Sequence, residues 1–237
     1  MTTYLHLLCI AVGGAIFPFR LWTLVRRPDV PNAAFCCYVG LSVLSYIVLL
    51  PPVYTEIDHA VGVTNSAGMI SAVSVLGLIA AQQTLLMHWN FPAAAAKRKI
   101  RIRVCLFLFL IALFVAAFFL WPPQKQKLAE FYFYYTRHPL EAPYLAIYLL
   151  GCVIGQFDVV RFCRRFARIT DRPWIRRGMR ITAMGATLIL IYCAIRIAEI
   201  ARSLFGADLS RLEPAAWLCG DIGSALALLG WFVPNLG

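Results

Sequence analysis

Seven long apolar runs, separated by short polar connections, dominate the pattern along the chain. Each run reaches about 20 residues, the length that an α-helix needs to cross a hydrocarbon core of roughly 30 Å. The runs lie near residues 4–25, 33–52, 66–88, 103–121, 143–163, 180–204 and 214–235. Because the connections are short, the pattern predicts one domain, residues 1–237, built as a single bundle of seven transmembrane helices.

Composition supports this class of protein. Hydrophobic residues make up 61% of the chain and charged residues only 14%, whereas a soluble domain has about 45–50% and about 25%. We therefore predict an all-α, multi-pass protein of the cell membrane, with the lipid bilayer as its main partner. The net charge of +11 does not indicate nucleic-acid binding, because the basic residues cluster in short loops. Nothing in the pattern indicates an oligomeric state.

The distribution of basic residues predicts the orientation. The connections after spans one, three and five contain 16 of the 22 Lys and Arg residues, and the opposite side contains five. The basic sets are Arg20, Arg26 and Arg27; Lys97, Arg98, Lys99, Arg101 and Arg103; and Arg161, Arg164, Arg165, Arg168, Arg172, Arg176, Arg177 and Arg180. The positive-inside rule then places the N-terminus outside and the C-terminus in the cytoplasm.

The sequence lacks the signatures of common cofactors. Its eight cysteines form no C-x-x-C pair and do not lie with histidine at zinc spacing. No lysine lies within a span, which excludes a retinal Schiff base, and no aspartate-rich motif is present to hold Mg²⁺ on a diphosphate. We predict no metal and no cofactor.

Five ionisable residues are predicted to lie in the outer third of the bundle. Glu56 and Asp58 follow the end of span two, Arg196 and Glu199 precede the outer end of span six, and Asp221 lies within span seven. A charge at the centre of a membrane costs roughly 2.5–3.5 kcal/mol on insertion scales, so such residues usually face the bundle interior and mark function.

Helical spacing groups some of these charges with aromatic rings. Trp217 and Asp221 are four residues apart and share a helix face, as do Tyr192, Arg196 and Glu199. The alternative interpretation of Arg196 and Glu199 is a structural pair that neutralises itself and joins helices.

Other polar positions are open to two interpretations. Asp158 lies one turn before Arg161, which predicts a local ion pair. Gln82 and Gln83 lie in the middle of span three and either bond neighbouring helices or line a pocket. The aromatic stretch at residues 130–139 is an interfacial belt or a lid over an apolar pocket.

This inventory fits one kind of chemistry. Protonation of an alkene or epoxide requires an undissociated acid, and burial in an apolar site raises the pKa of a carboxyl group so that it keeps its proton. Aromatic faces stabilise the resulting carbocation, and exclusion of water prevents its early quenching.

Length, seven spans, and acids at the end of span two and within span seven resemble the integral-membrane terpene cyclases, both the fungal meroterpenoid (pyripyropene-type) and the bacterial drimentine-type enzymes. The resemblance implies an isomerase of terpenoid secondary metabolism that cyclises a lipophilic prenylated small molecule without ionising a diphosphate. It implies that Glu56 and Asp221 are the catalytic acids, one donating the starting proton and the other positioning it or accepting the final one. Asp58, Arg196 and Glu199 would tune the charge around them, and Tyr54, Tyr192 and Trp217 would line the path of the cation.

A second resemblance supports another class of function. The stretches LPPVYTEIDHAVGV, RFCRRFAR and ALALLGWFVPNLG are similar to the membrane half of an actinobacterial family of putative transporters. The alternative function is therefore a small-molecule transporter or membrane sensor module that uses the same acids for proton coupling. A structural subunit without chemistry is a third possibility.

Overall fold

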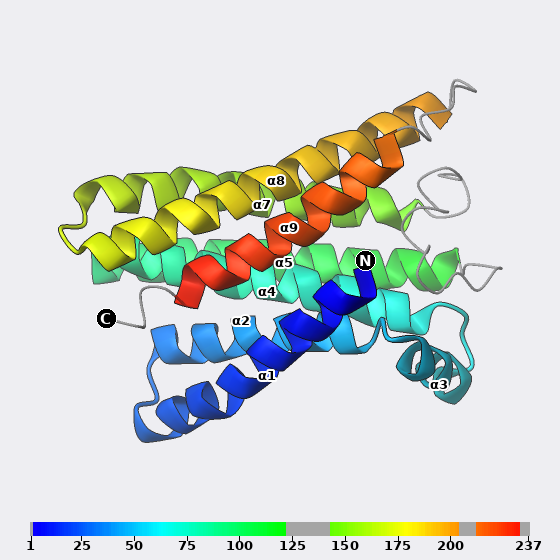
Figure 1. Ribbon diagram of the computed structural model, residues 1–237, viewed down its shortest axis with the longest axis horizontal. Coiled ribbons are helices and arrows are strands. Elements are labelled where there is room, and N and C mark those ends of the chain that lie inside the picture. Colours follow the sequence, from blue (N-terminus) through cyan, green and yellow to red (C-terminus); the bar gives the residue numbers. More distant parts are fainter. Residues whose placement is uncertain (1, 122–142, 204–211, 233–237) are drawn as a thin grey trace.

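The computed structural model describes residues 2–121, 143–203 and 212–232, which form helices and no strand (Figure 1). In chain order the helices are α1 (Thr2–Arg26), α2 (Val30–Ile47), α3 (Pro51–Val61), α4 (Ser66–Asn90), α5 (Ala93–Leu120), α7 (Tyr144–Ile169), α8 (Pro173–Ser203) and α9 (Glu213–Phe232). The predicted all-α class is confirmed for these residues.

Six of the described helices, α1, α2, α4, α5, α7 and α8, are long and apolar enough to cross a membrane. Their outward-facing side chains include Phe109 and Leu120 of α5, which are 62% and 70% exposed. Apolar side chains on the outside of a bundle are expected where the surrounding solvent is lipid. The chain is thus a multi-pass all-α membrane protein. Helix α9 has 20 residues and packs along α8, but it is not one of the six, so the count of seven spans stays a prediction.

The second predicted span, residues 33–52, is wrong at its end. Helix α2 stops at Ile47, and Pro51 and Pro52 begin the separate short helix α3. Proline suits the first turn of a helix because its missing N–H would have no partner there. Helix α3 ends at Gly62, whose φ of 70° lies in the left-handed region that glycine adopts readily. The acids of residues 56–58 therefore lie on a helix of their own.

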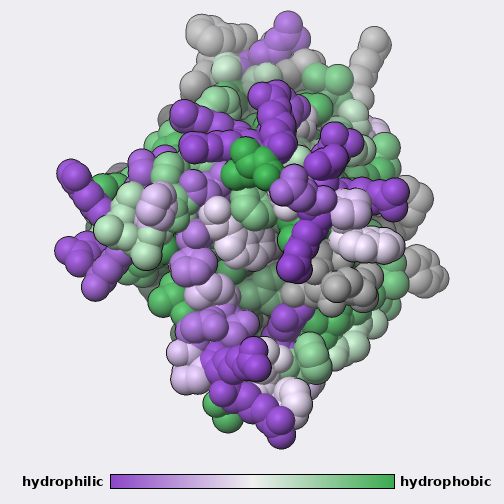
Figure 2. All heavy atoms as spheres, turned by 90° about the vertical axis from the view of Figure 1, so that its left-hand side faces the viewer, coloured by the Kyte–Doolittle hydropathy of each residue, from purple (hydrophilic) through white to green (hydrophobic). Residues whose placement is uncertain are grey.

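The basic connections gather at one end of the bundle. Figure 1 shows the α1–α2, α4–α5 and α7–α8 connections together at the end opposite α3. Figure 2 faces that end and shows many hydrophilic side chains across it. Arg27, Arg98, Arg165 and Arg172 are among the exposed basic residues there. Just inside this end, Arg103 of α5 pairs with Asp158 of α7 at 2.6 Å, so the strongest ion pair of Asp158 joins two helices and is not the predicted local pair with Arg161.

Helices α8 and α9 approach so closely that side chains would separate them. A Cβ on Gly185 would lie 2.5 Å from the Gly223 carbonyl oxygen and 2.5 Å from the Ala227 nitrogen. Gly230 meets the backbone of α8 at Gly178 and Thr182 in the same way. Small residues at these positions allow the backbones to pack directly, which is the usual basis of helix association in membranes. This contact fixes how α9 is rotated and therefore which of its side chains face the bundle.

Candidate functional site

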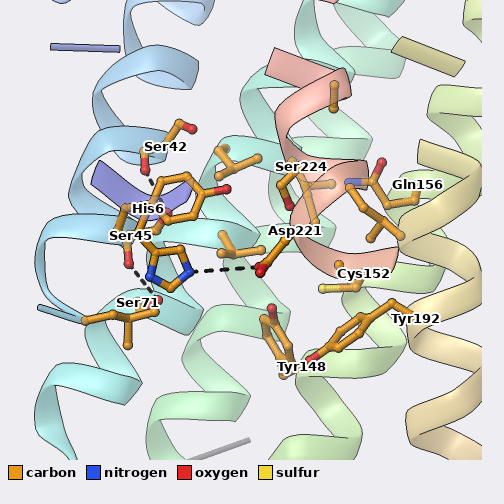
Figure 3. A pocket seen from close by; sticks show the side chains of 18 of the residues that line it. His6, Ser42, Ser45, Ser71, Tyr148, Cys152, Gln156, Tyr192, Asp221 and Ser224 are labelled. Atoms are coloured by element: carbon orange, nitrogen blue, oxygen red, sulfur yellow. Dashed lines mark hydrogen bonds and ion pairs between the residues drawn. The ribbon is translucent and has the colours of Figure 1, made fainter. Parts of the chain in front are cut away.

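A cavity of about 240 Å³ lies within the bundle, between side chains of α1, α2, α4, α7, α8 and α9 (Figure 3). An engineered cavity of about 150 Å³ holds one benzene molecule, so this space suits a ligand of about ten non-hydrogen atoms. Its apolar lining includes Leu49, Val75, Leu78, Ile79 and Ile189. Polar groups converge on this apolar space from several helices, which is the usual composition of a small-molecule site.

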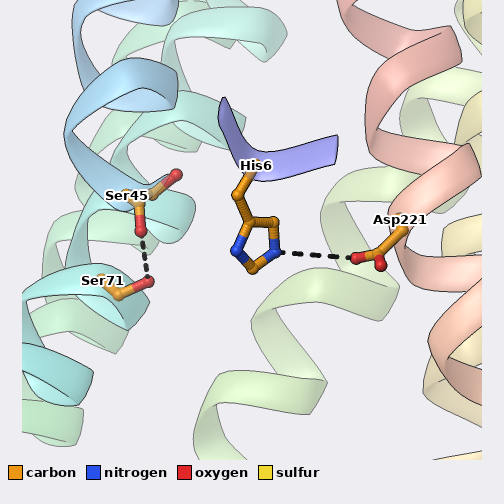
Figure 4. A network of polar contacts seen from close by, with 4 residues as sticks. All are labelled: His6, Ser45, Ser71 and Asp221. Atoms are coloured by element: carbon orange, nitrogen blue, oxygen red, sulfur yellow. Dashed lines mark hydrogen bonds and ion pairs between the residues drawn. The ribbon is translucent and has the colours of Figure 1, made fainter. Parts of the chain in front are cut away.

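Asp221 of α9 and His6 of α1 face each other across the cavity (Figures 3 and 4). His6 Nε2 lies 3.9 Å from Asp221 Oδ1, and each side chain is 19% exposed. This separation is too long for a hydrogen bond but short enough for an ion pair when the imidazole is protonated and the carboxyl group is ionised. The His6 ring also packs against Tyr46, with 5.2 Å between ring centroids. The pair therefore combines one carboxyl group with one imidazole in a partly enclosed space.

Hydroxyl groups form a second polar zone. Ser71 of α4 donates a hydrogen bond of 3.0 Å to the Ser45 carbonyl oxygen of α2 (Figure 4), and Ser45 donates one of 2.8 Å to the Ser42 carbonyl oxygen. Tyr46 lies within hydrogen-bonding reach of Ser224 on α9. All of these residues line the cavity. Both hydroxyl groups thus donate to backbone oxygens, and the Ser71 bond joins α4 to α2 while the Ser45 bond lies within α2.

Aromatic rings and thiols line the side of the cavity formed by α7 and α8. Tyr148 and Cys152 come from α7 and Tyr192 and Cys193 from α8, and Trp217 of α9 lies near them along the wall. Cys152 is within hydrogen-bonding reach of both Cys193 and Tyr148. These rings give the wall a polarisable surface of the kind that stabilises positive charge.

Two amides complete the lining. Gln82 of α4 is 1% exposed and Gln156 of α7 is 3% exposed, and both line the cavity. The Oε1 atom of each is buried and accepts no hydrogen bond from the described part of the chain. Gln83, the neighbour of Gln82, donates a hydrogen bond of 2.8 Å to the Gly155 carbonyl oxygen. Of the two adjacent glutamines, one therefore joins helices and the other lines the cavity.

Three of the eight site residues predicted from the sequence meet in this cavity: Asp221, Tyr192 and Trp217. Glu56 does not. Its side chain is exposed on α3 and does not line the cavity, so the structure does not bring together the two acids that the sequence analysis paired. The prolines at 51 and 52 start a new helix, and its direction carries Glu56 away from the bundle interior.

Asp58 and Tyr54 are buried beside the α3–α4 turn and not in the cavity. Asp58 accepts hydrogen bonds of 2.7 Å from the Asn65 N–H and 3.1 Å from the Ala67 N–H. These bonds satisfy backbone donors at the first turn of α4, as a capping side chain does. Tyr54 donates a 2.7 Å hydrogen bond to Asn65 Oδ1. Both residues thus stabilise a turn in which Asn65 has a φ of 63°.

Arg196 and Glu199 form an ion pair within α8, with the Arg196 guanidinium 5.3 Å from the centre of the Tyr192 ring. Arg196 is fully buried and Glu199 nearly so, and neither lines the cavity. The geometry favours the structural interpretation of this pair, although Arg196 touches Tyr192, which does line the cavity.

Several residues that line the cavity could not be identified from the sequence pattern. His6 lies near the start of α1, 215 positions before Asp221, and no spacing rule relates the two. Gln82 was one of two adjacent polar residues in a span, and only the rotation of α4 separates their roles. Tyr38 of α2 and Tyr148 and Gln156 of α7 lie among mostly apolar neighbours, and no motif relates them. A buried amide in a membrane helix was the one signal that could have indicated Gln156.

Within the described residues, no group of three or more His, Cys, Asp or Glu side chains lies close enough to hold a metal ion. The aromatic stretch at residues 130–139 lies outside the described residues. Comparisons with protein-family models, with curated proteins and with solved structures gave no match. The function is therefore argued from the cavity itself.

Proposed function

We propose that the protein binds a lipophilic, prenylated small molecule in this cavity and that Asp221 starts its cyclisation by donating a proton. The observation that carries the proposal is the position of Asp221, a single carboxyl group in an aromatic-lined cavity inside a membrane protein. An acid so placed has few structural explanations, since a buried carboxyl group in a membrane helix is costly.

The proposed reaction is an isomerisation. With an alkene, the Asp221 carboxyl proton passes to a carbon of the terminal double bond, whose electron pair forms the new C–H bond and leaves a cation on the other carbon. With an epoxide, the proton passes to the oxygen, and the C–O bond breaks with its electron pair on that oxygen to leave the cation. A second alkene then supplies the electron pair of the ring-closing bond. The final cation then loses a proton. If the Asp221 carboxylate accepts it, the starting acid is restored directly. If His6 accepts it, one further proton transfer from His6 to Asp221 restores the acid. No oxidant, reductant or leaving group is needed.

The cavity wall supports the intermediate steps. Tyr148, Tyr192 and Trp217 line the space where positive charge would develop, and the faces of aromatic rings stabilise such charge. His6, at 3.9 Å from Asp221, is placed to exchange protons with it. Arg196 and Glu199 neutralise each other. The titratable groups that act in the cavity would therefore be Asp221 and His6.

The arrangement in the membrane is part of the proposal. We infer that α9 is the seventh span, that the N-terminus lies outside and the C-terminus in the cytoplasm, and that the membrane is the cell membrane. The clustering of basic connections at one end supports this orientation. The His6–Asp221 end of the cavity then opens toward the outer leaflet, from which a lipophilic substrate can enter.

Incubation in deuterated water tests the proposal. Membranes containing the unmutated protein, supplied with the ten-carbon prenyl alcohol geraniol, should yield a cyclised isomer with one deuterium at the carbon protonated first. Asp221→Asn keeps the size of the side chain but cannot donate the proton. General acid catalysis typically contributes 10²–10⁴-fold, so product should fall at least 100-fold at equal protein level.

Glu56→Gln is the matched control and should form product normally, because Glu56 lies outside the cavity. Normal cyclisation by Asp221→Asn would contradict the mechanism.

The second candidate is a transporter or sensor module with proton-coupled ligand binding. The observation that favours it is the number of hydroxyl and amide groups in the cavity, from Ser42, Ser224, Gln82 and Gln156 among others. Such groups recognise a polar ligand and are not required to guide a carbocation. This candidate predicts ligand binding without any cyclised product, so the same incubation distinguishes the two.

A further inference from the structure

We propose that Gln82 and Gln156 form a subsite that binds a hydroxyl group of the ligand, so that the ligand of this cavity is a prenyl alcohol or phenol that enters with its hydroxyl first. The inference rests on the proposed binding function and deepens it. It concerns the deep part of the cavity, which the cyclisation mechanism leaves unused.

The first support is the state of the two amides. Both side chains are at least 97% buried, and neither Oε1 atom accepts a hydrogen bond from any residue that the structure describes. A buried polar group without a partner costs free energy, and native proteins rarely keep one without a purpose. Two such groups in one cavity indicate a ligand that supplies the missing hydrogen bonds.

The second support is the register of the helices that carry them. The hydrogen bond from Gln83 to the Gly155 carbonyl oxygen joins α4 to α7 at the positions next to Gln82 and Gln156. Gly155 has no side chain to separate the helices there, and Ile79 of α4 packs against it. This contact between their helices therefore fixes the positions of the two amides relative to each other.

The third support is their depth relative to Asp221. Helices α4, α7 and α9 all begin at the α3 end of the bundle (Figure 1). At 1.5 Å per residue, Asp221 lies about 12 Å along α9, whereas Gln156 lies about 18 Å along α7 and Gln82 about 24 Å along α4. The cavity thus has a charged pair nearer the α3 end and an amide pair deeper inside, with Ile79 and Ile189 among the apolar residues of its lining. A molecule with a polar head and a prenyl tail matches this order, and its terminal alkene would then lie toward Asp221.

A hydroxyl group suits the amides better than other heads of similar size. It donates to an amide oxygen and accepts from an amide nitrogen, so it satisfies both kinds of group. A carboxylate or phosphate would bring a charge, and among the described residues no Lys or Arg lines the cavity to balance it. The cavity volume of about 240 Å³ limits the whole ligand to about the size of geraniol.

Matched ligands and variants test the subsite. Purified protein in lipid nanodiscs is titrated with geraniol and with geranyl methyl ether, and binding is followed by the melting temperature and by calorimetry. One hydrogen bond to a neutral group corresponds to about 3- to 10-fold in affinity, so the unmutated protein should bind the alcohol tighter by that factor. Gln82→Met and Gln156→Met should bind both ligands with the affinity of the ether. Ser74→Ala is the control, because Ser74 lies on α4 but not in the cavity.

Stability gives an independent readout. Replacement of an unpartnered amide by an apolar side chain of similar size should raise the melting temperature of the ligand-free protein, whereas a structural glutamine would lower it. If a methionine variant does not fold, Gln156→Asn, which keeps the amide but shortens the side chain, should bind geraniol with lower affinity and keep its preference over the ether.

The outcomes separate the two proposals. Equal affinity for alcohol and ether, or unchanged preference in the methionine variants, would overturn the subsite even if cyclised product forms. A preference that disappears in those variants supports the subsite even if no product forms, and the cyclisation proposal alone would then fail.

Discussion

Glu56 and Asp58 lie two positions apart on α3 and end in different environments. Glu56 is exposed, while Asp58 is buried and accepts two backbone N–H groups at the start of α4. Because helix positions two apart point to different sides, one acid faces away from the protein while the other holds a turn. Neither lines the cavity with Asp221, so the proposed chemistry rests on one carboxyl group where the sequence suggested two.

Replacement of Asp58 tests its capping role. Asp58→Ala leaves the Asn65 and Ala67 N–H groups without their acceptor, and each buried donor without a partner costs about 1–3 kcal/mol. The melting temperature should therefore fall. Glu56→Gln, two residues away, is the control and should leave it unchanged. An unchanged melting temperature in Asp58→Ala would show that the two hydrogen bonds do not stabilise the turn.

Replacement of Glu199 tests the buried pair. Glu199→Gln removes the negative charge that faces the Arg196 guanidinium, and removal of one member of a buried ion pair typically costs about 3–5 kcal/mol. We expect a lower yield and melting temperature, with product per folded molecule preserved. The double variant Arg196→Met/Glu199→Met removes both charges and should recover much of the stability. Normal folding of Glu199→Gln with loss of product would instead make the pair part of the active site.

At the scale of secondary-structure elements, α9 depends on its contact with α8. The helix is 20 residues long and carries Asp221 eight residues from its start. Gly223 lies two residues beyond Asp221, and its close contact with Gly185 sets the rotation of α9. The same rotation directs Trp217, Asp221 and Ser224 into the cavity. The small residues thus have a role in the site as well as in the packing.

A pair of Gly→Ala changes tests this contact. Gly185→Ala would place a methyl group 2.5 Å from the α9 backbone, and forced overpacking typically costs about 1–3 kcal/mol. The melting temperature should fall, and both geraniol binding and product should fall with it as α9 moves. Gly14→Ala is the control, because nothing lies within 4 Å of its added Cβ and alanine favours a helix. Equal stability of the two variants would contradict the role of the α8–α9 contact.

At the scale of the whole molecule, charge is segregated along the bundle axis. The connections rich in Lys and Arg lie at one end (Figures 1 and 2). His6 and Asp221, which face each other, lie in the first halves of α1 and α9, away from that end. Anionic lipids attract basic loops to the cytoplasmic leaflet. The same asymmetry that orients the protein would therefore place the charged part of the cavity near the outer leaflet.

Reporter fusions test this orientation. A reporter fused after Gly237 should be active in the cytoplasm, and one inserted near Gln126 should be active outside, because 16 basic residues favour the cytoplasmic side and five the other. Both positions lie outside the described residues. The reverse pattern would place Asp221 and His6 toward the inner leaflet. If both reporters were active on the same side, an even number of spans would separate the two positions. Either α9 does not cross the membrane, or one of the two predicted spans before it does not.

The sequence by itself determined that this is an all-α membrane protein, roughly where its apolar helices lie, and that its basic residues fall into three connections. These properties are local, because a stretch of about 20 apolar residues forms a helix in lipid whatever its neighbours are. The sequence also directed attention to Asp221, Tyr192 and Trp217, since helical spacing relates residues on one helix. Only the tertiary structure showed that His6 lies against Asp221 and that Gln82 and Gln156 line the same cavity. It also showed that Glu56 lies outside this cavity. Contacts between helices depend on how each helix is rotated and how closely it packs, and neither is encoded by the residues of one helix alone. In this protein both are set by a few features: the prolines that begin α3, the Gln83–Gly155 hydrogen bond and the glycines between α8 and α9.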